Sequence, residues 1–141
     1  MDKITHILVI DDDSIDNFVS KTLIEKSNLV EEVTTIEDAR NAINYLKDQI
    51  LENPTQLPNI IFLDINMPSM SGWDFLKEFS EIDTRYTDNI SLIIFSSYIH
   101  AEEVRKLMSF KCVNCYQRKP LSLPIVKKIC LEYLEDALPS R

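Results

Sequence analysis

Acidic residues follow the first apolar run of the chain. The segment HILVIDDDSID (residues 6–16) places Asp11, Asp12 and Asp13 side by side directly behind that run. Neighbouring carboxylates repel one another, and in a partly dry crevice each raises the pKa of the others. A hard divalent cation removes this conflict, and oxygen ligands with retained water suit Mg²⁺. The segment therefore indicates a metal site, with plainly solvated side chains as the alternative.

Three more side chains that could take part in a reaction stand where other apolar runs end. Asp64 closes NIIFLD, Ser96 closes LIIFS, and Lys119 follows CYQR. A hydroxyl can donate to a phosphoryl oxygen, and a long ammonium arm can reach carboxylates. Around one carboxylate, such donors and cations are the equipment of phosphoryl transfer. Asp13 is expected instead to cap a helix, because DSID is a typical helix start.

Short β-branched runs alternate with stretches of helical period. Strands are expected at residues 7–10, 33–36, 60–63, 92–95 and 113–117, and helices at 15–23, 39–50, 73–80, 101–109 and 126–137. In the first helix, the spacing of Phe18, Val19 and Leu23 predicts a face that packs in the core. The polar segments 51–59 and 81–89 are expected to be loops. This alternation predicts an α/β fold with a parallel sheet covered on both faces.

The acidic residues would meet at one edge of such a sheet. In open parallel sheets, ligands bind beyond the carboxyl ends of the strands, where the strand order reverses. With the order 2-1-3-4-5, the first and third strands are neighbours and their helices leave to opposite faces. Asp11, Asp12 and Asp64 then converge in the crevice between the two strand ends.

Composition narrows the classes of function. The 141 residues carry a formal net charge of −8, which argues against a nucleic-acid or anionic-membrane surface. A single glycine, Gly72, excludes Walker and dinucleotide-binding loops. Two histidines, His6 and His100, leave little material for a zinc site and are expected at the surface or a sheet edge. Three cysteines without a secretory signal indicate the cytoplasm, and CVNC (112–115) is expected to fill the core.

Motifs in the right order along the chain resemble the receiver domain of response regulators, which has a flavodoxin-like doubly wound (βα)5 fold. They are contained in ILVIDDD, FLDINMPSMSGWDFL, IIFSS and YQRKPLS, and they extend over nearly the whole chain. The resemblance implies that Asp64 accepts a phosphoryl group from a sensor histidine kinase or a histidine phosphotransfer protein. It also implies a single receiver domain over residues 1–141, without an output domain.

The resemblance assigns roles to the other site residues. Asp11 and Asp12 are similar to the acidic pair that binds Mg²⁺ (Mn²⁺ being possible) together with Asp64, and the backbone carbonyl of Asn66 is a further ligand. Lys119 matches the conserved lysine of the motif, whose peptide to Pro120 is commonly cis. Ser96 and Tyr116 match the hydroxyl and the aromatic ring that switch the surface of the helix after the fourth strand.

The same resemblance sets expectations about activity and partners. The protein is expected to be a signalling phosphoacceptor and not an enzyme, with limited self-phosphorylation from small donors and slow self-dephosphorylation. Tyr98, two residues after Ser96, could shield the phosphoryl group from water. A downstream protein partner of unknown identity and a monomer or weak homodimer are expected.

Gly72 is expected to supply backbone freedom after the MP turn.

Two other functions remain open on the residues alone. LVIDDDSI also fits the opening of haloacid-dehalogenase-type phosphatases, with Asp11 as nucleophile and Asp13 as acid. That alternative leaves Asp64 without a role and lacks an acidic pair placed soon after Lys119. The second alternative is an interaction module that is not phosphorylated, although such a module would be expected to lack one of the key residues.

Overall fold

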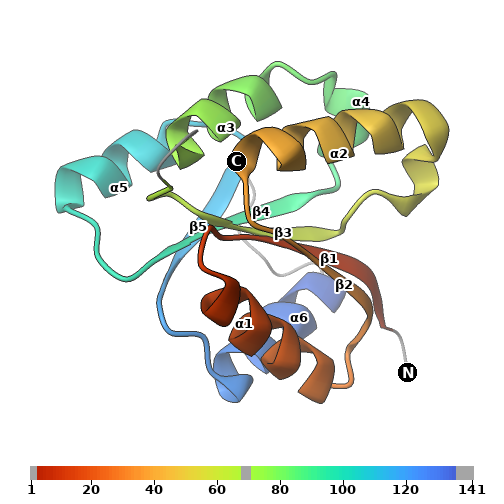
Figure 1. Cartoon of the computed structure of the whole chain (residues 1–141), viewed down its shortest axis with the longest axis vertical. Helices are drawn as coiled ribbons and strands as arrows, with labels where there is room; N and C mark the ends of the chain where they lie inside the picture. Colours follow the sequence, from red (N-terminus) through yellow and green to blue (C-terminus); the bar gives the residue numbers. More distant parts are fainter. Residues whose placement is uncertain (1–2, 68–70, 136–141) are drawn as a thin grey trace.

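A five-stranded parallel sheet forms the centre of the computed structural model, which describes residues 3–67 and 71–135 (Figure 1). The strand order is β2-β1-β3-β4-β5, as predicted. All pairings are parallel. The strands are β1 (Ile4–Ile10), β2 (Val30–Ile36), β3 (Ile60–Asp64), β4 (Ser91–Ser96) and β5 (Val113–Arg118).

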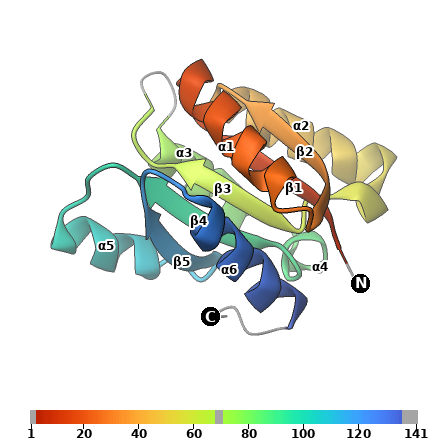
Figure 2. The same cartoon turned by 90° about the horizontal axis from the view of Figure 1, so that it is seen from below.

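Helices cover both faces of the sheet. They are α1 (Ser14–Lys26), α2 (Ala39–Glu52), α3 (Gly72–Ser80), α4 (Thr84–Thr87), α5 (Ala101–Met108) and α6 (Leu123–Leu134). Helices α1 and α6 lie on one face, and α2, α3 and α5 lie on the other (Figures 1 and 2). The two segments predicted as loops contain the short helix α4 and a 3-10 turn, Pro54–Gln56. Ala137, predicted in the last helix, and Pro68 of the MP turn lie outside the described residues.

Two apolar clusters, one on each face, hold these layers together. One joins α2, α3 and α5 to the sheet through residues such as Leu46, Phe75 and Leu107. The other joins α1 and α6 through Ile24 and Val126. Strands β3 and β4 are buried along their whole length, which explains why their sequences are continuous apolar runs and do not alternate. The doubly wound α/β prediction is therefore confirmed.

The prediction that Phe18, Val19 and Leu23 of α1 form a buried face is wrong for Phe18 and Val19. Phe18 is 70% exposed and Val19 is 45% exposed, while Leu23 packs only partly. The buried residues of this helix are Asn17, Ser20 and Ile24. Asn17 faces inward because its side-chain Nδ2 donates to the backbone carbonyl of Asp11 at 2.7 Å, which supplies a buried oxygen with a partner. The apolar side chains of the first half of α1 are thus turned to solvent, while Ile24 near its end packs in the core.

His6 also departs from the prediction of a surface or edge position. It is 2% exposed, and its Nε2 lies 2.8 Å from Thr34 Oγ1 while its Nδ1 lies 3.2 Å from the carbonyl oxygen of Gln56. Both ring nitrogens therefore have partners, which makes the burial of a polar ring tolerable. Spacing could not show this, because the partners lie 28 and 50 residues away.

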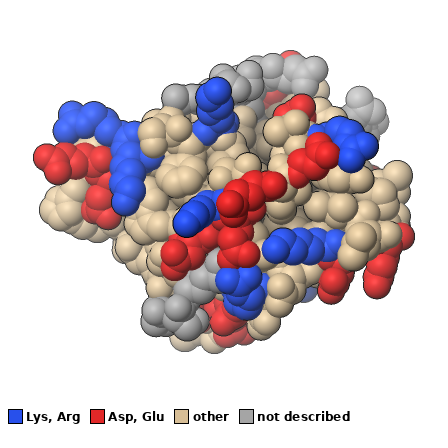
Figure 3. Space-filling view, turned by 90° about the horizontal axis from the view of Figure 1, so that it is seen from above, with Lys and Arg blue, Asp and Glu red and all other residues tan. Residues whose placement is uncertain are grey.

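The surface formed by α2, α3 and α5 carries both acidic and basic side chains (Figure 3). On the face that α2, α3 and α5 cover, acidic and basic side chains lie next to one another (Figure 3), as in the pairs of Glu78 with Arg40 and Lys47. In residues 3–67 and 71–135, none of the helices combines the length and the apolar character needed to cross a membrane.

Candidate functional site: an acidic crevice at the ends of β1 and β3

The carboxyl ends of β1 and β3 bring three carboxylates together. Strands β1 and β3 are direct neighbours, with Ile10 paired to Leu63. Asp11 and Asp12 follow the first strand and Asp64 ends the other. One carboxylate oxygen from each of Asp11, Asp12 and Asp64 lies within 4.8 Å of the others. Asp11 and Asp64 are buried, whereas Asp12 is exposed, so the group opens to solvent on one side.

The Lys119 side chain supplies positive charge to this group. Its Nζ lies 2.6 Å from Asp11 Oδ2 and 3.4 Å from Asp64 Oδ2. The backbone N–H of Lys119 donates to the carbonyl of Ser96 at 2.9 Å, which ties the end of β5 to the end of β4. The peptide from Lys119 to Pro120 is cis. The fold thus places the Lys119 ammonium beside Asp11 and Asp64.

Asp64 sits in an environment that opposes its ionisation. Burial raises the pKa of Asp64 to about 6, because the side chain is removed from water and faces Asp11. The backbone N–H of Asn66 donates to Asp64 Oδ1 at 3.0 Å and, with the Lys119 ammonium, offsets part of this increase in the pKa. The carboxylate therefore needs more positive charge than the protein alone provides.

The carboxylate oxygens of the crevice and its lack of positive charge suit the binding of a hard divalent cation. The group of Asp11, Asp12 and Asp64 offers only carboxylate oxygens, which are the ligands that Mg²⁺ prefers. The exposure of Asp12 leaves room for the waters that Mg²⁺ retains. The carbonyl of Asn66 as a further ligand stays a prediction.

Asp13, the third acid of the run, has a structural role. It precedes α1 as the N-cap residue, and its Oδ1 accepts hydrogen bonds from the backbone N–H groups of Ile15 at 2.8 Å and Asp16 at 3.2 Å. Those bonds use the carboxylate that the phosphatase alternative requires as a catalytic acid. The geometry therefore agrees with the cap prediction and counts against the phosphatase.

A hydrogen-bonded chain links the acceptor candidate to the end of β4. The Asn66 Nδ2 group donates to Ser96 Oγ at 3.1 Å, and Ser96 Oγ donates to the carbonyl of Tyr98 at 3.0 Å. Ser96 is 1% exposed, whereas Asn66 and Tyr98 are exposed, so both bonds are partly buried. In this structure the Ser96 hydroxyl is therefore held by Asn66 and Tyr98 and does not point to Asp64.

The two aromatic residues of interest take different positions. Tyr116 on β5 is half-buried and packs against the core cluster on the α5 side. Tyr98 is 60% exposed, and its hydroxyl lies 3.1 Å from Nδ1 of His100 at the start of α5. Shielding of a phosphoryl group by Tyr98 remains a prediction, since here the ring contacts His100.

Gly72 is needed for a reason other than the predicted one. No glycine of the chain has a positive φ, so backbone freedom is not used at Gly72. A Cβ atom at this position would lie 2.6 Å from Ile65 Cα and 2.8 Å from the carbonyl oxygen of Asp64. Glycine therefore permits α3 to start in contact with the backbone of the acceptor strand.

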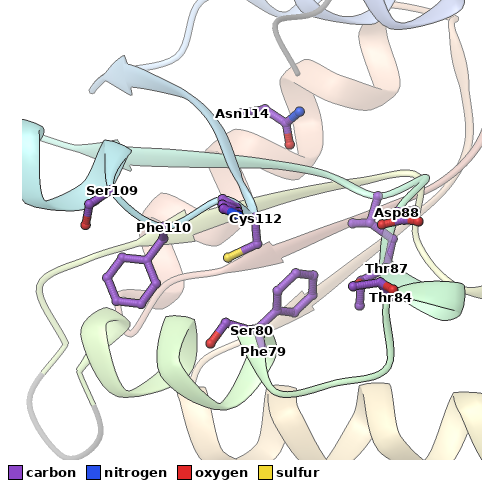
Figure 4. A pocket seen from close by; sticks show the side chains of 11 residues that line it. Phe79, Ser80, Thr84, Thr87, Asp88, Ser109, Phe110, Cys112 and Asn114 are labelled. Atoms are coloured by element: carbon purple, nitrogen blue, oxygen red, sulfur yellow. The ribbon is translucent and has the colours of Figure 1, made fainter. Parts of the chain in front are cut away.

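A cavity separate from the acidic crevice lies at the opposite edge of the sheet, near the amino ends of β4 and β5. It measures about 500 Å³, and Figure 4 shows the Phe79 ring and the Cys112 thiol facing the same space. Burial raises the pKa of Cys112 to about 11, so this thiol stays protonated at neutral pH. Cys112 and Cys115 pack against opposite core clusters, as expected for filler positions.

Two residues near the crevice were missed by the sequence analysis. Asp16 Oδ2 lies 3.2 Å from Lys119 Nζ, and Asn17 holds the carbonyl of Asp11. The motif DSID indicates only that Asp16 is an acid in the first helical turn, where its charge interacts favourably with the helix dipole. Its contact with Lys119 joins residues 103 positions apart, which no local pattern reveals.

Comparison with known proteins gives one consistent family. The model of the response regulator receiver domain matches residues 7–128. The chain is 33% identical to the two-component response regulator ORR6 of Oryza sativa subsp. japonica, over 89% of this chain and 68% of that protein. Among solved structures it resembles a two-component response regulator from Cytophaga hutchinsonii, with a TM-score of 0.85, 29% identity and coverage of 94% and 98%.

A further structure connects the family to phosphorylation. The phosphorylated cyanobacterial phytochrome response regulator RcpA has a TM-score of 0.74 and 27% identity, with coverage of 99% of this chain and 100% of that one. The strand order β2-β1-β3-β4-β5 and the helices on both faces agree with the fold of these solved structures. The chain therefore belongs to the response regulator receiver domain family of two-component signalling.

Proposed function

We propose that this protein accepts a phosphoryl group on Asp64, with Mg²⁺, from a histidine kinase or a histidine phosphotransfer protein. The observation that carries the proposal is the meeting of Lys119 Nζ with Asp11 and Asp64 at the ends of three strands. An acceptor carboxylate, an acidic pair and a fixed ammonium are what this transfer needs.

The transfer itself is a displacement at phosphorus. A carboxylate oxygen of Asp64 forms the new O–P bond while the N–P bond of the donor phosphohistidine breaks, and the released imidazole takes up a proton from water. Asp64 Oδ2 faces Lys119 and Oδ1 accepts from the backbone of Asn66. Lys119 would then balance the charge of the arriving phosphoryl oxygens.

The bound Mg²⁺ would supply charge neutralisation to both partners of the reaction. Asp11, Asp12, Asp64 and the carbonyl of Asn66 would hold it. The protein's own contribution is to keep these oxygens in place: the backbone N–H of Asp13 donates to Asp11 Oδ1 at 3.0 Å, and Asn17 fixes the Asp11 backbone.

The exposed apolar face of α1 supports docking of the phosphodonor at the crevice. Ile15 is 71% exposed and, with Phe18 and Val19, forms a patch that we call the α1 patch. It continues into a cavity of about 410 Å³ whose lining includes Val19 and Lys119. An exposed apolar patch next to a reactive crevice fits a partner helix that presents the phosphohistidine above Asp64.

Ser96 and Tyr116 would pass the change to the surface of α5. For Ser96 Oγ to reach a phosphoryl oxygen, it must leave the Tyr98 carbonyl that it contacts at 3.0 Å. That movement would free space on the side where Tyr116 is half-buried against the core. Two states that differ in such contacts are what a switch requires.

The switch is testable with the single tryptophan of the chain. The ammonium of Lys106 on α5 lies 4.5 Å from the ring centroid of Trp73, so movement of α5 should change the fluorescence of Trp73. Ser96→Ala should still be labelled by acetyl phosphate but should show a smaller fluorescence change than the parent. An unaltered fluorescence change in Ser96→Ala would contradict this route.

The phosphoacceptor function is tested by incubating the protein with acetyl phosphate and Mg²⁺ and measuring the intact mass. One acid-stable, base-labile phosphoryl group per chain is expected, and chelation of Mg²⁺ should prevent its formation. The same sample of Asp64→Asn should remain unlabelled while its circular dichroism stays that of a folded protein. A parent protein that stays unlabelled would support the interaction-module alternative.

A further inference from the structure

Asp16 contacts the Lys119 ammonium although neither the family motifs nor the proposed transfer gives it a role. Its Oδ2 lies 3.2 Å from Lys119 Nζ, compared with 2.6 Å for Asp11 Oδ2 and 3.4 Å for Asp64 Oδ2. One ammonium group is thus shared among three carboxylates. The distance from the ammonium to Asp16 is thus similar to its distance to the acceptor Asp64.

The three carboxylates lie in different surroundings. The side chains of Asp11 and Asp64 are 1% and 7% exposed, whereas that of Asp16 is 47% exposed. Asp16 belongs to the first turn of α1 and lines the cavity of about 410 Å³ together with Phe95 and Lys119. The Lys119 ammonium also lies 4.8 Å from the ring centroid of Phe95. The Lys119 ammonium therefore has partners on the α1 side of the crevice as well as its contacts with Asp11 and Asp64.

We propose that Asp16 is a positioning residue that holds Lys119 on the α1 side and restrains its approach to the phosphoryl group on Asp64. The proposal rests on the phosphoacceptor function of Asp64. Two physical effects act in the same direction: Asp16 competes for the ammonium, and its negative charge opposes the arrival of a phosphoryl dianion nearby. Because Asp16 is half-exposed, the combined effect should be modest, about two- to fivefold in rate.

The first test compares labelling rates with acetyl phosphate at saturating Mg²⁺. Asp16→Asn should be labelled about two- to fivefold faster than the parent, and Asp16→Glu, which keeps the charge, should return towards the parental rate. Asp13→Asn is the matched control, because it removes a neighbouring charge while asparagine still caps α1. The acceleration should shrink at high ionic strength, because the charge is partly exposed. An unchanged or slower Asp16→Asn, or an equal acceleration in Asp13→Asn, overturns the proposal.

A second measurement does not depend on phosphorylation. The NMR signals of the Lys119 ε-methylene group in the metal-free protein report its position, because the neighbouring Phe95 ring shifts them. Asp16→Asn should move these signals and Asp13→Asn should leave them in place. Unmoved Lys119 signals in Asp16→Asn would refute the positioning role. If the parent is not labelled, the phosphoacceptor function fails, whereas the NMR comparison still decides the role of Asp16.

Discussion

Asp64 combines a buried position with a charge that its proposed chemistry requires. The acceptor must be ionised to attack phosphorus, yet burial raises its pKa to about 6 from an ordinary value of 3.8. A carboxyl group whose pKa is raised by folding stabilises the protein at low pH, and this stabilisation is lost as the pH rises through 6. At neutral pH the ionised Asp64 therefore destabilises the folded state, which is a common feature of functional sites.

Replacing Asp64 should consequently stabilise the metal-free protein. A pKa difference of one unit corresponds to about 1.4 kcal/mol, so Asp64→Asn should increase the free energy of unfolding by about 1–3 kcal/mol near neutral pH. The gain should shrink as the pH falls from above 6 towards 4, because the parent Asp64 then becomes neutral as well. Urea unfolding with a chelator present measures both effects. Asp12→Asn, at an exposed carboxylate, should change stability less; a pH-independent gain in Asp64→Asn would contradict the burial argument.

Among the elements, α1 shows where sequence reasoning fails. Strands β3 and β4 were predictable because their continuous apolar runs reflect burial directly, and helices α2, α3, α5 and α6 were predictable from their 3.6-residue periodicity. In α1 the apolar residues have helical spacing too, but Phe18 faces solvent and Asn17 faces the sheet. Periodicity reports that a helix has an apolar face and cannot report whether a sheet or a partner protein covers it.

The α1 patch should matter for transfer between proteins and not for folding. Phe18→Ser should change the free energy of unfolding by less than about 0.5 kcal/mol, because the ring is 70% exposed. Transfer from a phosphohistidine donor protein should slow roughly tenfold, as for loss of an aromatic interface contact. Labelling by acetyl phosphate should be unaffected.

A matched control for this variant lies on α2. Leu51 is 83% exposed and lies near the C-terminal end of α2, on the opposite face of the sheet from α1 (Figure 1), so Leu51→Ser should leave transfer from the donor protein unchanged. Equal transfer rates for Phe18→Ser and the parent, or equal losses in Phe18→Ser and Leu51→Ser, would show that the α1 patch is not a specific docking surface.

The start of α3 packs directly against the backbone at the end of the acceptor strand. In Gly72→Ala the new methyl group would stand 2.6 Å from Ile65 Cα, and neither backbone can yield cheaply. We expect a loss of about 1–3 kcal/mol in the free energy of unfolding, as for overpacked cores, together with slower labelling of Asp64. Thermal and urea unfolding measure the first effect. A variant as stable as the parent would show that the close approach is not needed.

At the scale of the molecule, the fold explains why residues so far apart in sequence form one site. Parallel strands place their carboxyl ends at one edge, so Asp11, Asp64, Ser96 and Lys119 meet although they belong to four strands or their loops. That much could be predicted from the order of the apolar runs. Three contacts could not be predicted in this way, because each depends on how residues distant in sequence pack in three dimensions. They are the contact of Lys119 with Asp16, the hydrogen bond from Asn66 to Ser96, and the close packing at Gly72.

The most direct test of the whole account is to locate the phosphoryl group on the chain. The protein is labelled with acetyl phosphate and Mg²⁺, reduced with borohydride, which converts an acyl phosphate on aspartate to homoserine, and mapped by peptide mass spectrometry. Homoserine is expected at position 64 in the parent protein and nowhere in Asp64→Asn. Homoserine at Asp11 or Asp12 in place of Asp64, or a parent protein with no modified aspartate, would contradict it.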